Sequence, residues 1–301
     1  MNDARIAVID VGTNTFHILI VESNGHGYRE IHRERVFVKL AEDGISNLSA
    51  GAVKRGLETL LHFRALVDGH DVSSWRVIGT AALRTAKNGP EFMQKVQEST
   101  GFEIELIVGT KEAEFIYEGV RQVCSFDSKP SLIMDIGGGS VEFIIADNTG
   151  ILWLASYPIG VAVLFRRFHK KDPISPLERK HLFDFLSIEL MPLNQCLKEM
   201  KPRSLIGASG TFDVLAALIG NVQDTKFHTC TPEQLIPIME QISKMSHEQR
   251  HKDPRIPVDR VDMIVVAVLL VRYILDMGNF EDIGFSRYAL KEGLLVDLLN
   301  V

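Results

Sequence analysis

Residues 7–15 read AVIDVGTNT, and residues 132–140 read LIMDIGGGS. In both stretches an apolar run ends at an aspartate, a turn of small residues follows, and a second apolar run begins. This order predicts a β-hairpin, because glycine and small polar residues permit a tight turn between two strands. The aspartates, Asp10 and Asp135, lie 125 positions apart (135 minus 10). The repeated hairpin therefore predicts two similar domains that face each other.

Helices are expected in the segments between and after the hairpins. Ser49 precedes apolar residues at helical spacing, and residues 175–178 form a capping box that predicts a long helix to about Lys198. Residues 231–234 repeat this device, and a strongly apolar helix is expected over residues 259–277. Short strands are expected near residues 76–79, 103–108, 204–207 and 282–286. Strands mixed with helices in both halves indicate an α/β fold.

The composition is typical of a soluble globular protein of about two domains, with 301 residues of which 46% are hydrophobic and 24% charged. No apolar stretch reaches the roughly 18 residues of a membrane span. The apolar run at residues 6–9 is too short for a signal peptide. The cysteines are scattered, as expected for reduced thiols: Cys124, Cys196 and Cys230. We therefore expect a cytoplasmic protein that has no membrane partner.

The formal charge of −6 argues against a surface that binds nucleic acid. A polyanion can still bind in a local pocket of backbone amides, cations and metal. The two hairpin turns suit this role, because glycine lets backbone N–H groups approach a phosphate closely. The candidate phosphate-binding residues in the two turns are Gly12, Thr13, Asn14, Gly137, Gly138, Gly139 and Ser140. A single hairpin of this kind is usually only a tight turn, whereas two matching copies favour a phosphate site.

Asp10 and Asp135 stand at the strand ends, where hard carboxylate oxygens would hold Mg²⁺ through water. A third glycine loop lies between a strand and a helix and either presents amides to an anion or is an ordinary turn. Its candidate residues are Gly207, Ser209, Gly210 and Thr211.

Two further residues have a catalytic and a structural interpretation. Glu112 is expected in the first turn of a helix that Thr110 caps. There it either orients an attacking water or only stabilises the helix dipole. Arg84 either clamps a phosphate in a bidentate manner or is an exposed helix residue.

Other motifs are interpreted as coincidental or leave alternatives open. Residues 247–251 read HEQRH and match a zinc-protease pattern, but polar flanks and Pro254 argue against that site. The basic residues 166–171 are either a solvated face or an entrance that attracts polyanions. The sequence contains neither a P-loop nor a G-x-G-x-x-G fingerprint, which argues against enzymes built on those motifs.

In combination and order, these segments resemble the exopolyphosphatase and guanosine pentaphosphate phosphohydrolase family, within the superfamily of actin, sugar kinases and heat-shock ATPases. The resemblance covers nearly the whole chain. The segments that carry it are residues 10–15, 79–88, 109–113, 135–142, 207–211, 259–262 and 291–295.

The resemblance implies two ribonuclease-H-like domains, residues 1–125 and 126–301, with an active-site cleft between them and a C-terminal helix that can pack back on the first domain. It also implies that Glu112 activates the water, that Asp135 and Glu142 assist with metal or water, and that Asn14 and Arg84 face the phosphate. The implied cofactor is Mg²⁺ or Mn²⁺, and the implied assembly is a homodimer.

The implied activity is release of terminal orthophosphate from inorganic polyphosphate or from pppGpp, and the sequence does not rank these substrates. Two alternatives are a non-catalytic sensor that binds an alarmone or nucleotide and an ATP-dependent kinase of a small molecule. Three departures from the family pattern bear on activity. Lys111 replaces a frequent glutamate and predicts a more basic site, whereas Val163 and Ala289 replace a frequent polar residue and a frequent glycine.

Overall fold

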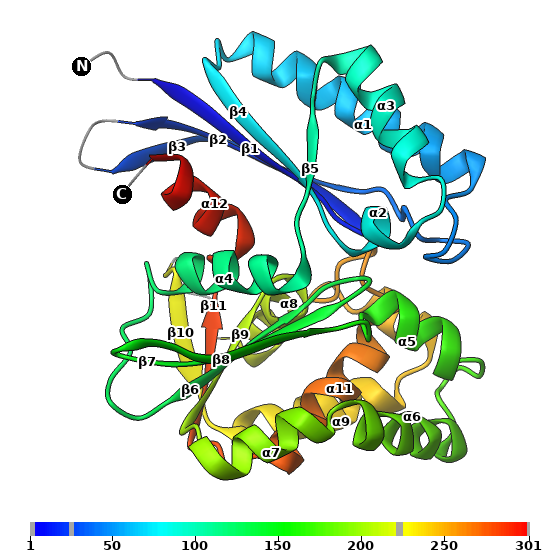
Figure 1. Ribbon diagram of the computed structural model, residues 1–301. Coiled ribbons are helices and arrows are strands. Elements are labelled where there is room, and N and C mark those ends of the chain that lie inside the picture. Colours follow the sequence, from blue (N-terminus) through cyan, green and yellow to red (C-terminus); the bar gives the residue numbers. More distant parts are fainter. Residues whose placement is uncertain (1–3, 24–26, 221–224, 300–301) are drawn as a thin grey trace.

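The computed structural model describes residues 4–23, 27–220 and 225–299 and contains two mixed β-sheets (Figure 1). The strands of the first sheet are β1 (Arg5–Val11), β2 (Thr15–Ser23), β3 (Tyr28–Phe37), β4 (Ser74–Gly79) and β5 (Ile104–Leu106), in the order β3-β2-β1-β4-β5. Those of the second are β6 (Ser131–Ile136), β7 (Val141–Asp147), β8 (Gly150–Tyr157), β9 (Ser204–Ala208), β10 (Phe227–Cys230) and β11 (Asp282–Ser286), in the order β10-β11-β9-β6-β7-β8.

Each sheet joins an antiparallel meander of three strands to two further strands that run parallel to its central strand, and in the second sheet β10 adds an antiparallel edge. The predicted α/β fold with two ribonuclease-H-like units is thereby confirmed. Both predicted hairpins are present: Asp10 of β1 lies opposite His17 of β2, and Asp135 of β6 lies opposite Glu142 of β7. Strands β1 and β6 are paired along both edges, which explains their continuous apolar sequences.

The helices cover the outer faces of the sheets and fill the space between them (Figure 1). Helices of the first half are α1 (Ala50–Gly69), α2 (Ala81–Thr85), α3 (Gly89–Thr100) and α4 (Gly109–Val120). Those of the second half are α5 (Val161–Phe168), α6 (Pro176–Glu189), α7 (Met191–Met200), α8 (Gly210–Ile219), α9 (Pro232–Lys244), α10 (His247–Lys252), α11 (Ile264–Met277) and α12 (Leu290–Leu299). None of the helices in the described residues is long and apolar enough to cross a membrane.

Helices α4 and α12 lie between the two sheets and pack against each other (Figure 1). One apolar core contains residues of both helices together with buried residues of β1, β4, β6 and β9. Two ion pairs attach α12 to the first sheet: Arg33 to Glu292 at 2.8 Å and Arg76 to Asp297 at 2.6 Å. The division of the chain at residues 125 and 126 stays a prediction.

Three predicted helix boundaries were wrong. The long helix expected from Ser175 breaks at Leu190 into α6 and α7, because Pro192 lacks the N–H that a continuous helix would bond. The apolar helix starts at Ile264, since residues 259–263 form turns. The N-cap of α4 is Val108 and not Thr110, although Glu112 does lie in the first turn.

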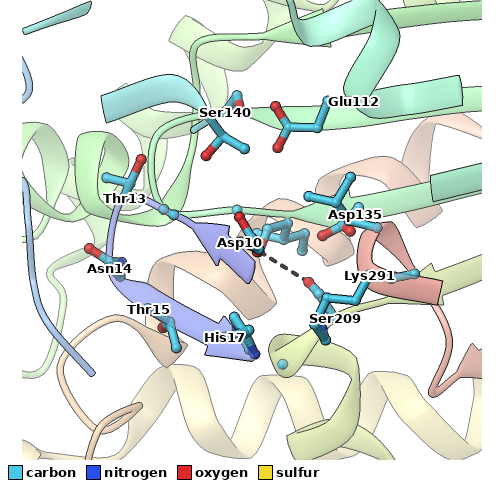
Figure 2. Close-up of a pocket in the computed structure, with 18 of the residues that line it drawn as sticks. Asp10, Thr13, Asn14, Thr15, His17, Glu112, Asp135, Ser140, Ser209 and Lys291 are labelled. Atoms are coloured by element: carbon cyan, nitrogen blue, oxygen red, sulfur yellow. Dashed lines mark hydrogen bonds between the residues drawn. The ribbon is translucent and has the colours of Figure 1, made fainter. Parts of the chain in front are cut away.

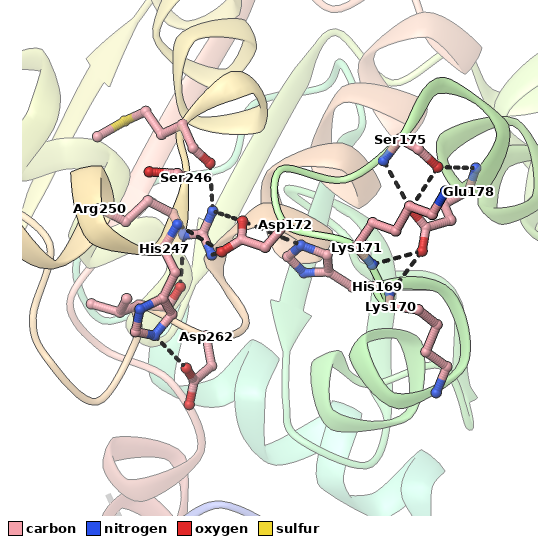
Figure 3. A network of polar contacts seen from close by, with 12 residues as sticks. His169, Lys170, Lys171, Asp172, Ser175, Glu178, Ser246, His247, Arg250 and Asp262 are labelled. Carbon is pink, nitrogen blue, oxygen red and sulfur yellow. Dashed lines mark hydrogen bonds and ion pairs between the residues drawn. The ribbon is translucent and has the colours of Figure 1, made fainter.

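A polar network joins the α5–α6 loop to the segment before α11 (Figure 3). The carboxylate of Asp172 accepts hydrogen bonds from the guanidinium of Arg250 at 3.0 and 3.3 Å and from the amide of His247 at 2.6 Å. Arg250 is fully buried, so its charge needs this partner. His247 is hydrogen-bonded in turn to Asp262, and the carboxylate of Asp262 also accepts a hydrogen bond from Lys39 in the segment after β3. The network therefore connects the two halves of the molecule.

Candidate functional site

A cavity of about 250 Å³ lies where the two hairpin turns face each other. It is bounded by the ends of β1, β2, β6 and β7, the start of α4 and the segments that begin α8 and α12. Figure 2 shows its lining. The predicted residues that line it are Asp10, Gly12, Thr13, Asn14, Glu112, Asp135, Gly137, Gly138, Gly139, Ser140, Glu142, Ser209 and Gly210.

Five carboxylates line this cavity. Asp10 and Asp135 come from the central strands β1 and β6, and Glu142, the second residue of β7, lies directly opposite Asp135. Glu112 enters from the first turn of α4, and Asp213 enters from the first turn of α8. Glu112 Oε2 accepts a bond of 2.9 Å from Arg84 Nη1, and Glu142 Oε1 accepts one of 2.6 Å from the Ser156 hydroxyl.

Burial gives these acids unusual proton affinities. It raises the pKa of Asp10 to about 7 even though Lys291 opposes the shift. Burial likewise raises the pKa of Glu142 to about 7, and it raises the pKa of Asp135. The pKa of Glu112 lies well above its usual range through burial and the charge of Glu142, with Arg84 acting in the opposite direction. Displaced pKa values in one cavity are typical of catalytic sites.

The turns approach each other closely because glycine occupies the points of contact. A Cβ atom on Gly138 would lie 2.8 Å from the side chain of Asn14, and one on Gly160 would lie 2.4 Å from the backbone of Gly138. The hydroxyl of Thr13 is buried at this junction without a hydrogen-bond partner among the described residues. Glycine turns and hydroxyl side chains from both halves thus line the cavity, and their amides and hydroxyls are the kind of donors that a phosphate site requires.

Cations gather around His17, at the end of the cavity that Figure 2 shows away from Glu112, and Asp213 lies among them. The cations on the lining are Arg33, Arg35, Arg260, Arg287 and Lys291. Arg35 pairs with Asp259 at 3.1 Å, whereas the buried Nε of Arg260 lies 3.8 Å from the same carboxylate and has no hydrogen-bond partner in the described part of the chain. Arg260 lies over Gly210 at the start of α8, where a Cβ would meet its guanidinium at 2.1 Å. Burial, followed by the neighbouring cations, lowers the pKa of His17 well below its usual range.

The third glycine loop only partly reaches the cavity. Gly207 lies beneath the ring of Phe212, and Thr211 is buried away from the lining. Ser209 adopts a left-handed φ of 69°, and its hydroxyl donates to the carbonyl of Ile136 at 3.3 Å. Such a conformation in a non-glycine residue is costly and concentrates at functional sites.

Sequence reasoning missed the cationic end. Arg33 and Arg35 stand two positions apart on β3, a spacing that places both on one face of a strand. That spacing was the available signal, but β3 was not predicted. Arg260, Arg287 and Lys291 come from segments whose meeting point no local pattern reveals.

The departures from the family pattern have different locations. Lys111 pairs with Glu114 at 2.9 Å and is absent from the cavity lining, so the expectation that it makes the site more basic stays a prediction. Ala289 does line the cavity, and Val163 lines a neighbouring space. In the zinc-like motif, the rings of His247 and His251 stack with their centroids 6.3 Å apart, and His247 is bonded to Asp262.

Asp10 and Asp135 suit a magnesium ion chemically. Asp10 Oδ1 is buried without a hydrogen-bond partner among the described residues, which leaves an acceptor directed at a missing group. Mg²⁺ is commonly held by one or two carboxylates and completes its shell with water and phosphate oxygens. Across residues 4–23, 27–220 and 225–299, no set of three His, Cys, Asp or Glu side chains forms a metal cage. A two-carboxylate site open to substrate oxygens is therefore the arrangement that fits.

Comparison with known proteins shows which family and which solved structures this chain resembles. A model of the Ppx/GppA phosphatase family matches residues 19–301. The crystal structure of an exopolyphosphatase from Cytophaga hutchinsonii is 34% identical, with a TM-score of 0.95 and 98% of each chain covered. A Ppx/GppA enzyme of Aquifex aeolicus is 26% identical, with a TM-score of 0.80 and coverage of 98% of this chain and 99% of that one.

Curated relatives carry two kinds of name. A putative exopolyphosphatase of Haemophilus influenzae is 29% identical over 99% of this chain and 92% of its own length. A guanosine-5'-triphosphate,3'-diphosphate pyrophosphatase of Vibrio vulnificus is 27% identical over 99% of this chain. The present chain spans 60% of the length of that longer relative.

Proposed function

The chain belongs to the Ppx/GppA phosphatase family, and on that premise we propose that it hydrolyses the terminal phosphoanhydride bond of inorganic polyphosphate or pppGpp. Relatives named for each activity support this pair of substrates. The observation that carries the proposal is one cavity that has Glu112 at one end and, at the other, a cluster of cations suited to a polyanion.

In the proposed reaction, Glu112 accepts a proton from water, and the water oxygen attacks the terminal phosphorus. The bond to the bridging oxygen breaks, and its electron pair leaves with the shortened polyphosphate or the nucleotide. Its raised pKa makes the Glu112 carboxylate a stronger base than an exposed glutamate. Amides of the glycine turns would stabilise charge on the equatorial oxygens. Mg²⁺ or Mn²⁺ held by Asp10 and Asp135 would supply positive charge against the phosphate oxygens.

The cationic end fits the leaving group. Phosphoryl transfer keeps the attacking and leaving oxygens roughly in line, so the leaving group lies away from Glu112. Arg35, Arg260 and Lys291 lie on the lining at that far end. They would compensate the charge that develops on the bridging oxygen and on the phosphates beyond it.

The first test is orthophosphate release by the purified protein with Mg²⁺, from short polyphosphate, long polyphosphate, pppGpp and ATP. We expect release from at least one of the first three and a loss of about 100-fold or more in Glu112→Gln, which removes the base. Glu114→Gln is the matched control, because Glu114 lies on the same helix but pairs with Lys111 outside the cavity.

Wild-type release by Glu112→Gln would contradict the mechanism. Nucleotide binding without release would favour the sensor, and ATP consumption that requires an acceptor would favour the kinase. The homodimer, the cytoplasmic location and the choice between Mg²⁺ and Mn²⁺ stay predictions, and sedimentation and metal titration of the same protein test the first and the last.

A further inference from the structure

A second chamber of about 440 Å³ lies beside the reaction cavity. The two spaces share Ala81, Gly139 and Ser140 in their linings. Figure 2 shows Ser140 and Glu112 at the same end of the reaction cavity, away from Lys291. The chamber reaches the surface at Val108, whose side chain is among the exposed apolar residues at 62% exposure. It therefore lies between the Glu112 end of the reaction cavity and solvent.

Two polar contacts separate the chamber from the reaction cavity. Arg84 lines the chamber and donates to Glu112, which lines the reaction cavity. Ser156 lines the chamber and donates to Glu142, which also lines the reaction cavity. The partition is thus made of side chains that can rotate, in contrast to the backbone contacts between the glycine turns.

In-line attack determines which reactant or product lies on each side of the partition. The substrate and its leaving group occupy the cationic end, so a bound polyanion blocks that route to solvent. The attacking water then lies on the Glu112 side, and the released orthophosphate is left on the same side. The chamber is the open space that adjoins this side.

The lining of the chamber suits an anion the size of orthophosphate. Arg84 supplies one cation, and hydroxyls come from Thr85, Thr110, Ser140 and Ser156. Its described lining contains no carboxylate. Arg84 uses Nη1 for both Glu112 and the carbonyl of Ile107, at 2.9 and 2.6 Å. A guanidinium presents five donors, so Arg84 can hold Glu112 and an anion at the same time.

We propose that this chamber binds the orthophosphate product on its way to solvent, with Arg84 as the cationic group that holds it. The role of the chamber as a product site rests on the proposed hydrolysis. Its binding of inorganic phosphate, however, can be measured without any substrate. The proposal also predicts that cleavage and product release respond to different residues.

The test uses a substitution that fills the chamber at a residue that is not one of the catalytic groups. Val163→Trp places a large ring in it from α5, and Ile188→Trp on the exposed face of α6 is the matched control. Calorimetric titration with inorganic phosphate is expected to find two sites, the reaction cavity and the chamber, in the wild type and in Ile188→Trp. In Val163→Trp it is expected to find only the site in the reaction cavity. Rapid chemical quench should show unchanged cleavage in the first turnover, while a phosphate sensor should show release slowed about tenfold.

Unchanged phosphate stoichiometry together with wild-type release in Val163→Trp would overturn the proposal. Val108→Trp repeats the test from the exposed rim of the chamber, where a bulky residue leaves the core intact. If no substrate is hydrolysed by the wild type, the proposed function fails. The phosphate titration still shows whether the chamber binds phosphate, so failure of the proposed function and failure of the chamber proposal are distinguishable.

Discussion

At the scale of single residues, the site depends on glycines at positions where any side chain would hold the two hairpin turns apart. Gly139 faces the other turn so closely that a Cβ would lie 2.7 Å from both the Thr13 hydroxyl and the Ala81 methyl. Distances under 3.0 Å require that a neighbour move. The turn of β6 and β7 could then meet that of β1 and β2 only after a shift of several tenths of an ångström.

Gly139→Ala is therefore expected to lower phosphate release by about 100-fold, since misplacement of about 1 Å can have that effect. The circular dichroism spectrum should stay that of the wild type. Gly69→Ala at the end of α1 is the control, because a Cβ there meets nothing within 4 Å and the backbone is not left-handed. Full activity in Gly139→Ala would show that the turns need not meet so closely.

At the scale of elements, local hydrogen bonds set where several helices begin. The start of α6 is the clearest case (Figure 3). The carboxylate of Glu178 accepts bonds from the amide and hydroxyl of Ser175 at 2.8 and 2.6 Å, and from the amides of Lys170 and Lys171 at 2.8 and 2.9 Å. Burial alone would raise the pKa of Glu178, but these bonds outweigh it and hold the pKa at about 2.

Glu178→Gln is expected to lower the free energy of unfolding at pH 7 by about 1 kcal/mol, the usual effect of losing a helix cap. Because the folded-state pKa is depressed, the carboxylate stabilises the protein above its unfolded value, near 4.5, and this contribution is lost as the pH falls towards 2. Urea unfolding at pH 7, 5 and 3.5 measures the difference. A difference that stays constant over this range would contradict the role of the charge.

At the scale of the whole molecule, α4 and α12 make the two sheets share a core. Buried residues from both sheets contact these helices in one apolar cluster. A core shared in this way couples the halves, because neither sheet can lose its inner face without exposing the other. The same helices carry Glu112 and Lys291, so the element that joins the halves also places site residues at both ends of the cavity.

Leu294→Ala on α12 removes a fully buried side chain from this shared core and is expected to cost about 2–5 kcal/mol. Trp75 on β4 and Trp153 on β8 are the two tryptophans and report on separate halves. In Trp75→Phe and in Trp153→Phe, the fluorescence of the remaining tryptophan follows one half at a time during urea unfolding. The two proteins should show the same midpoint, and Leu294→Ala should lower both midpoints equally. Leu177→Ala, at an exposed position, is the control. Separate midpoints for the two tryptophans would show that the halves unfold independently.

Much of the candidate site was predictable because its residues stand in short repeated patterns. The two aspartates, the glycine turns and Glu112 were found from strand ends, turn composition and the family resemblance, and the structure brings them to one cavity. Gly207 and Thr211 were predicted with them but lie outside the lining, since a glycine loop in sequence does not show which of its residues face a ligand.

The sequence by itself determined the hairpins, the capping boxes and the α/β class, because each depends on interactions among residues only a few positions apart. Only the tertiary structure decided the pairing of Arg84 with Glu112 and the cationic end of the cavity. The contact of Arg33 with Glu292 joins residues 259 positions apart. Such contacts form where two folded surfaces meet, and the residues that make them carry no local signal of their partners.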